Sequence, residues 1–199
     1  IVRVIDQKAE NFSKEIVVKG FTKADKKVFV KSETSGKIVD LPIAQGTFVK
    51  KGEVICSLFV AERQANFDKA LLDFNSAQKL YEEELYSSKQ LQNAKSNYER
   101  AKLELDYANI KAPFDGVVDK IDLDVGDFLN RGSTCATLLD LDPMMITGDI
   151  SENELLDLTK ESSVKVITND GQEFQGQITF ISASADEMMH TFDIEISIP

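Results

Sequence analysis

The chain contains one short glycine-rich pattern twice. The stretch "SGKIVDLPIAQGTFVKKGEVICSL" begins at Ser35, and "DGVVDKIDLDVGDFLNRGSTCATL" begins at Asp115. Without any gap, the three glycines of the first copy fall on glycines 80 residues later, and apolar positions fall on apolar positions. Glycine supplies the positive φ angles of tight turns between short strands. Because about 25 residues cannot bury a core alone, we expect the two copies to pack together as a flattened barrel with approximate two-fold symmetry.

The segment between the copies has a different composition and a different period. Residues 59–109 contain neither glycine nor proline and are rich in alanine, leucine, glutamate, lysine and glutamine, which favours helix. Large residues recur every seven positions beside rows of alanine: Phe67, Phe74 and Tyr81 with Ala70 and Ala77, then Leu91, Tyr98 and Leu105 with Ala94, Ala101 and Ala108. This spacing predicts an antiparallel coiled-coil hairpin. Ser87 followed by Gln90 predicts a capping box that opens the second helix.

The two cysteines fall one position apart in the repeat. Cys56 aligns with Ala136 and Cys135 with Ile55. Since neighbouring strand positions point to opposite faces, we expect two buried thiols and no disulfide. His190 is the only histidine and has no partners at metal-ligand spacing, so we expect a surface or structural role for it.

Charge and composition exclude several classes of function. The net charge of -11 argues against nucleic-acid binding, which needs a basic face. No run of about 18 apolar residues is present to span a membrane, and we expect membrane attachment through a segment outside this sequence. No catalytic set, metal cluster or phosphate-binding loop is found, so we expect no enzyme activity and no cofactor.

The repeated pattern resembles the biotinyl/lipoyl-like domain, whose two halves are related in the same way. In the carrier members of that group, a lysine on the hairpin between the halves takes the cofactor. The corresponding place here reads "FVAER" from Phe59 to Arg63 and offers no lysine in a tight turn. A carrier domain therefore stays as an alternative. Mass spectrometry that shows an added lipoyl or biotinyl group would support it.

A lipoyl-like domain split by a helical hairpin resembles the periplasmic adaptor subunits of bacterial efflux and secretion pumps, the membrane fusion proteins. The segment "LELDYANIKAPFDGVV", Leu103 to Val118, is very similar to that family's return from the hairpin to the second lipoyl half. The segments "LDPMMITGDISENEL" and "TFDIEISI" are similar to its barrel sequences. Ser151 and Glu154 predict a capping box and a short helix over residues 152–158.

The resemblance implies an α+β multi-module fold. A lipoyl-like β-sandwich or flattened barrel is split by the coiled-coil hairpin and is joined by a small β-barrel domain. We assign residues 1–27 to N-terminal strands of the barrel, with a membrane-proximal remnant such as "VRVID". The two lipoyl halves take 28–58 and 110–140, the hairpin takes 59–109, and the rest of the barrel takes 141–199.

The resemblance also implies a function without catalysis in the Gram-negative periplasm. The expected partners are an inner-membrane transporter, proton-driven or ATP-driven, an outer-membrane channel, and further copies of the chain in a ring. The family's hairpin tip carries Arg, Leu and Ser at a fixed spacing, which Leu80 and Ser87 fit, whereas Ser76 stands in place of the Arg. We predict channel contact at Leu80, Ser87 and Leu91. A self-assembling structural coiled-coil protein that moves nothing is the second alternative, and co-purification with a transporter separates the two.

Overall fold

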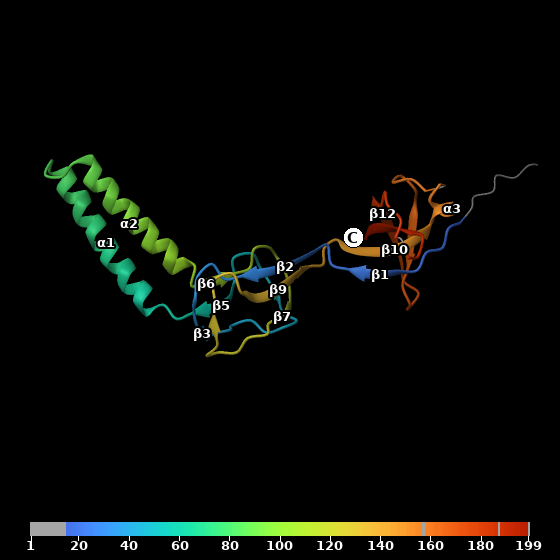
Figure 1. Ribbon diagram of the computed structural model, residues 1–199, viewed down its shortest axis with the longest axis horizontal. Coiled ribbons are helices and arrows are strands. Elements are labelled where there is room, and N and C mark those ends of the chain that lie inside the picture. The colour runs from blue at the N-terminus through green and yellow to red at the C-terminus, as the bar shows by residue number, and fades with distance from the viewer. Residues whose placement is uncertain (1–14, 157, 187, 199) are drawn as a thin grey trace, which may run out of the picture. The chain divides into compact units, whose positions relative to one another are not determined.

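The chain folds as two compact units. The computed structural model describes residues 15–156, 158–186 and 188–198 (Figure 1). One unit is formed by residues 24–142, and the other by residues 1–23 together with 143–199. The predicted remnant "VRVID" lies outside the described residues.

The unit of residues 24–142 contains two four-stranded sheets. The first has the order β2 (Lys26–Lys31), β9 (Thr134–Asp140), β7 (Gly116–Lys120), β4 (Phe48–Val49). The second has the order β6 (Asn109–Lys111), β5 (Val54–Leu58), β3 (Gly36–Asp40), β8 (Phe128–Leu129). Every strand pair in both sheets is antiparallel.

The two sequence copies interlock in these sheets. A step of 80 residues carries β3 onto β7, β4 onto β8 and β5 onto β9. Gly36 of the first copy pairs with Leu129 of the second, and Phe48 pairs with Val117. The copies therefore pack together as predicted, and each copy also completes a sheet of the other, which the sequence did not indicate.

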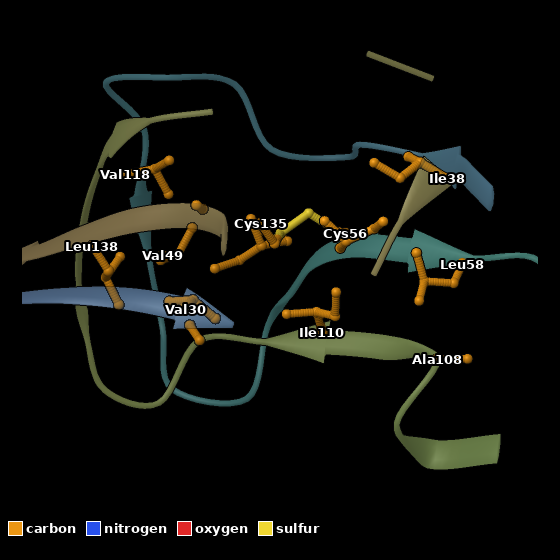
Figure 2. Close-up of a cluster of buried hydrophobic side chains, with 14 residues drawn as sticks. Val30, Ile38, Val49, Cys56, Leu58, Ala108, Ile110, Val118, Cys135 and Leu138 are labelled. Atoms are coloured by element: carbon orange, nitrogen blue, oxygen red, sulfur yellow. A yellow bond between two sulfur atoms is a disulfide. The ribbon is translucent and has the colours of Figure 1, made fainter. Parts of the chain in front are cut away.

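Side chains of both copies share one core between the sheets (Figure 2). The equivalent residues Ile38 and Val118 are both buried, as are Leu58 and Leu138. Each fully buried aliphatic side chain stabilises the fold by about 1.5–3 kcal/mol. The apolar frame that defines the repeat is therefore the frame of the core.

The two cysteines form a disulfide, so the prediction of two free thiols was wrong. Cys56 and Cys135 are bonded, with their Cα atoms 6.6 Å apart (Figure 2). The expected alternation fails because each strand bulges at the same repeat position. Ile55 has no partner between the pairs made by Val54 and Cys56, and Cys135 has none between the pairs made by its neighbours. At a bulge two successive side chains can turn to one face, and Ile55 and Cys56 are both buried.

Two helices occupy the interval between β5 and β6. They are α1 (Ala61–Glu82) and α2 (Ser88–Asp106), which lie side by side and are joined by residues 83–87 (Figure 1). The strands on either side of the pair are hydrogen-bonded neighbours, with Cys56 opposite Ile110 and Ser57 opposite Asn109. Both ends of the helical hairpin are thus held by one ladder.

The second unit is built on one antiparallel sheet. Its order is β1 (Gly20–Lys23), β10 (Met144–Ser151), β13 (Thr191–Ile198), β12 (Glu173–Ile181), β11 (Val164–Ile167). Buried isoleucines of β10, β12 and β13 form its core. Among the described residues no ladder joins β1 to β11, two strands of only four residues each, so the predicted barrel is an open sheet there.

The predicted short helix after β10 is present but ends early. The helix α3 (Glu152–Leu155) begins with the expected Ser151–Glu154 capping box. It was expected to reach Leu158, whose backbone N–H instead donates to the Leu155 carbonyl at 3.1 Å. An i to i+3 bond of this kind is typical of a tightening last turn.

Candidate partner-binding site on the helical hairpin

Residues of the predicted rows form the contact between the two helices, except Tyr81, which was expected in the seam and is 44% exposed. Tyr98 of α2 lies between two rings of α1, with its centroid 5.6 Å from that of Phe67 and 5.4 Å from that of Phe74. Ala77 is buried at the same seam. Centroid separations of 4.5–7 Å are those of favourable aromatic pairs, so this cluster is a stabilising side-chain contact between the two helices.

The predicted contact residues lie around the turn at the hairpin tip. Leu80 is half-buried in the last turn of α1, and its carbonyl accepts the N–H groups of Leu85 and Tyr86 at 2.7 and 3.1 Å. Ser87 is exposed and caps α2, and Leu91 is half-buried one turn further on. The structure therefore brings the three residues to one end of the hairpin, and Ser87 is the most accessible of them.

Ser87 makes the predicted capping box with Gln90. The Gln90 backbone N–H donates to the Ser87 hydroxyl, and the Ser87 N–H donates to the Gln90 carboxamide at 2.8 Å. These bonds satisfy two of the orphan N–H groups at the start of α2. Ser87 thus has a structural role whether or not it also contacts a partner.

The tip presents apolar side chains that the sequence reasoning missed. Leu85 is 66% exposed, Tyr81 44% and Tyr86 37%, whereas large apolar residues of a hairpin usually face its seam. Glu84 adopts a φ of 60° in the turn, which turns the chain sharply just before Leu85. Leu85 and Tyr86 belong to neither heptad row, and that departure was the signal available in the sequence.

A groove runs along one face of the hairpin. Its volume is about 480 Å³. Small and uncharged polar side chains predominate in its lining, which is formed by Asn66, Lys69, Ala70, Asp73, Ser76, Ala77, Tyr86, Gln90, Ala94 and Asn97. Ser76, which stands where the family's tip arginine is expected, therefore faces this groove.

The base of the hairpin is fastened to the sheets by Arg63. Its guanidinium donates to the Phe59 carbonyl at 3.0 Å, to the Thr34 hydroxyl at 2.9 Å and to the Ser35 carbonyl at 2.6 Å. The Leu58 N–H also donates to the Ala108 carbonyl at 2.8 Å. These bonds fix the direction in which α1 leaves β5.

The described residues contain no group of three or more histidine, cysteine, aspartate and glutamate side chains placed to hold a metal ion. None of the helices in this part of the chain combines the length and the apolar character of a membrane span. His190 is exposed, and its backbone N–H donates to the Asp186 carbonyl at 2.9 Å.

Two carboxylates of the five-stranded unit face each other across a ladder. Asp149 of β10 is paired with Asp193 of β13. Desolvation, followed by the hydrogen bond and the charge of Asp193, raises the pKa of Asp149 above its ordinary value. The folded chain therefore binds a proton at the Asp149 carboxylate more tightly than the unfolded chain does. The stability that this protonation contributes is lost as the pH rises through the raised pKa.

We expect Asp149→Asn to raise the melting temperature at pH 7, because the amide removes the repulsion between the two carboxylates. The gain should shrink as the pH falls, and it should vanish below about pH 4, where the acid is protonated in both states. Asp170→Asn is the control, for which we expect the opposite change in melting temperature. A hydrogen bond from Thr168 lowers the pKa of Asp170, so losing its charge should destabilise the chain at pH 7. Calorimetry across pH measures both, and a pH-independent effect of Asp149→Asn would contradict the account.

This chain is similar in sequence to several known proteins. The sequence profile of the RND MFP barrel-sandwich hybrid domain matches residues 26–141. An uncharacterised protein of Haemophilus influenzae is 22% identical over 98% of this chain and 55% of its own length. The multidrug resistance protein MdtA of Photorhabdus laumondii is 25% identical over 77% of this chain and 46% of its own length. The chain thus spans about half the length of the curated relatives it matches.

A solved structure shows the same fold. The membrane fusion protein Spr0693 of Streptococcus pneumoniae superposes with a TM-score of 0.71 at 15% identity, covering 92% of this chain and 91% of that one. At this identity the likeness concerns the fold alone.

Proposed function

Because this chain belongs to the membrane fusion protein family, whose barrel-sandwich hybrid domain it contains, we propose that it is a periplasmic adaptor. In this proposal it links an inner-membrane transporter to an outer-membrane channel in a tripartite efflux or secretion system. The relative MdtA is described as a multidrug resistance protein, which makes export of small toxic compounds the first activity to test. The transporter is proton-driven or ATP-driven.

The observation that carries this proposal is the helical hairpin with its apolar tip. A folded module of two sheets needs no projecting helix pair to complete its core, and of the residues in α1 and α2 only Ala77 is buried. The exposed Leu85, Tyr81 and Tyr86 lie at its end. Exposed aromatic and leucine side chains gathered in one place mark a surface for a protein partner.

The disulfide supports a location outside the cytoplasm. Disulfides form and persist in oxidising compartments, including the bacterial periplasm. The Cys56–Cys135 bond lies in the core of the two-sheet unit. This agrees with an adaptor whose described part works in the periplasm, with its membrane attachment elsewhere in the protein.

The proposed mechanism is mechanical and breaks no bond of the cargo. The chain acts in a ring of copies, with lipoyl-like halves at residues 28–58 and 110–140 and with the hairpin at 59–109 extending as a coiled coil toward the channel. The barrel domain, which we assign to residues 1–27 and 141–199 and which contains the five-stranded sheet, contacts the transporter. Relative motion of domains is the usual behaviour of small modules in one chain, and we expect a conformational change in the transporter to move the hairpin in this way.

Channel binding at the tip gives the direct test. We expect Leu80→Glu combined with Ser87→Asp to weaken channel binding about 30-fold, the effect of losing about 2 kcal/mol at an interface hot spot. Aspartate at position 87 is itself a good N-cap, so α2 should stay folded while the tip gains charge. Channel affinity and export from cells are the measurements, with helical circular dichroism to verify the fold.

Leu72→Glu is the matched control for this variant. Leu72 is 67% exposed on α1, away from the tip, so the same Leu→Glu change there should leave channel binding and export unchanged. Normal export by the double tip variant would contradict a tip contact at Leu80, Ser87 and Leu91. Co-purification from membranes with the full-length protein as bait then identifies the transporter and channel.

A further inference from the structure

The helical hairpin and the five-stranded unit are attached to different sheets. The chain enters α1 from β5 and leaves α2 into β6, and these two strands are neighbours in one sheet. The chain enters and leaves the five-stranded unit through β2 and β9, which are neighbours in the other sheet. A force that acts between the hairpin and the five-stranded unit therefore has to pass from one sheet to the other.

The Cys56–Cys135 disulfide joins these two sheets. Cys56 lies on β5, which continues into α1, and Cys135 lies on β9, which continues through residues 141–143 into β10. The bond encloses a sequence separation of 79 residues, which includes the whole hairpin. Side chains of β5 and β9 also pack together in the shared core (Figure 2).

The position of the disulfide follows from the two equivalent bulges. Ile55 and Cys135 are the unpaired residues of β5 and β9, and they are repeat counterparts. Without the bulges the two sulfur atoms would point to opposite faces of their strands. A bulge that turns two successive side chains to one face removes this obstacle, and the irregularity occurs in both copies although each has only one cysteine.

We propose that the Cys56–Cys135 disulfide is a covalent tie that transmits force between the hairpin-bearing sheet and the sheet that leads to the five-stranded unit. The mechanical role rests on the proposed function as an adaptor. The existence of the disulfide does not depend on that function. Its position between the strand that continues into the hairpin and the strand that leads to the five-stranded unit does not depend on it either. The disulfide then gives a short covalent path between the hairpin and the five-stranded unit. This path bypasses both backbone paths, the one that runs from α1 back to β2 and the one that runs from α2 on to β9.

The tie also implies an oxidation step during folding. Each thiol loses one proton, and the two electrons reduce the disulfide of a protein thiol oxidase to a dithiol while the new sulfur–sulfur bond forms. Cys56 is fully buried and Cys135 is 1% exposed in the folded chain, so an oxidase has no access after the sheets close. Oxidation therefore precedes closure and waits until Cys135 of the second copy has reached the oxidising compartment.

Single-molecule extension tests the tie on the purified full chain. Peptide tags at the hairpin turn near Glu83 and at the C-terminal end serve as attachment points that leave the cysteines untouched. From Glu83 to the tie the short way runs along α1 over about 27 residues, and the long way along α2 to Cys135 covers about 52 residues. At about 3.3–3.6 Å per residue, the oxidised chain should stop about 80–90 Å short of the reduced chain.

Reduction and substitution should give the same longer extension. The variant Cys56→Ala with Cys135→Val is chosen from the repeat, in which alanine and a β-branched residue occupy the equivalent positions. Alkylation of the unfolded, unreduced wild-type chain should add no mass, because the described cysteines are both bonded. Equal extensions for oxidised and reduced chains, or alkylation of both thiols, would overturn the tie.

Export assays separate the tie from the adaptor function. If the double cysteine variant folds, extends further and loses export while the transporter and channel still co-purify, the mechanical role is supported. If that variant exports normally, the tie exists without a role in transmission and that part of the proposal fails. If neither chain binds a transporter or channel, the adaptor function fails while the extension result stands by itself.

Discussion

Gly116→Ala is expected to lower the free energy of unfolding by about 3 kcal/mol, at the upper end of the range for overpacked cores. Gly116 is buried in β7 beside β9. A Cβ built there meets the backbone carbonyl oxygen of Leu139 well inside contact distance, and the Phe114 ring at 3.2 Å. A backbone oxygen within a ladder cannot move aside as a flexible side chain can, so β7 and β9 would have to separate.

The repeat supplies the control for this variant. Gly36 holds the equivalent position in the first copy, and a Cβ there lies 3.3 Å from the Leu58 Cβ and 3.7 Å from an Arg63 guanidinium nitrogen. Gly36→Ala should cost less than about 1 kcal/mol, because small shifts of these side chains are offset by the reduced flexibility of the unfolded chain. Denaturant unfolding measures both variants. Equal losses would show that the two copies are sterically alike and that the close approach at Gly116 is wrong.

Tyr98→Ala should unfold the helical hairpin at a lower temperature while the two-sheet unit stays folded. The variant removes both ring contacts between the helices, with Phe67 and with Phe74. Loss of two aromatic pairs and of a half-buried ring costs about 2–3 kcal/mol. Most of the stability of a helix in a protein comes from such tertiary packing and not from intrinsic propensity. Hydrogen exchange should therefore rise over α1 and α2 and remain slow in β5 and β9.

Two further variants locate the effect of Tyr98→Ala. Tyr98→Phe keeps the ring and should retain the hairpin. Tyr81→Ala changes the residue that the heptad pattern placed in the same row as Phe74, although Tyr81 is 44% exposed in the structure. Its loss should cost less than about 1 kcal/mol. Fast hydrogen exchange over both helices in Tyr81→Ala would show that Tyr81 does pack at the seam between the helices.

The architecture of the two-sheet unit was accessible from sequence because its signals are local and repeated. Glycines, apolar alternation and the 80-residue offset predicted strands that pack together, and equivalent core residues such as Ile38 and Val118 are both buried. The heptad rows also predicted which helix faces meet, and Tyr98 does lie against Phe67 and Phe74. Ser87 and Gln90 marked the start of α2 because capping depends only on nearby residues.

The disulfide could not be predicted from the sequence because it depends on irregular strands. The pairing of strands from one copy with strands of the other could not be predicted because it joins residues far apart in the sequence. A period of two residues assumes regular strands, and the bulges at Ile55 and Cys135 break it. A repeat likewise indicates similar halves but does not say whether each half forms its own sheet, and here Gly36 pairs with Leu129 of the other copy. The candidate tip was found in outline from spacing, but the exposure of Leu85 depends on the turn conformation, which no short motif fixes.

The insertion point of the hairpin also bears on how such chains change over generations. Along the two-sheet unit each successive strand moves to the opposite sheet, except from β5 to β6, which are neighbours in the same ladder. Segments added or removed there leave every other pairing in place, so the reach of the molecule is free to vary in whole helical turns under selection. Under the adaptor function that we propose, a change in the distance to the partner requires changes in this one inserted segment only.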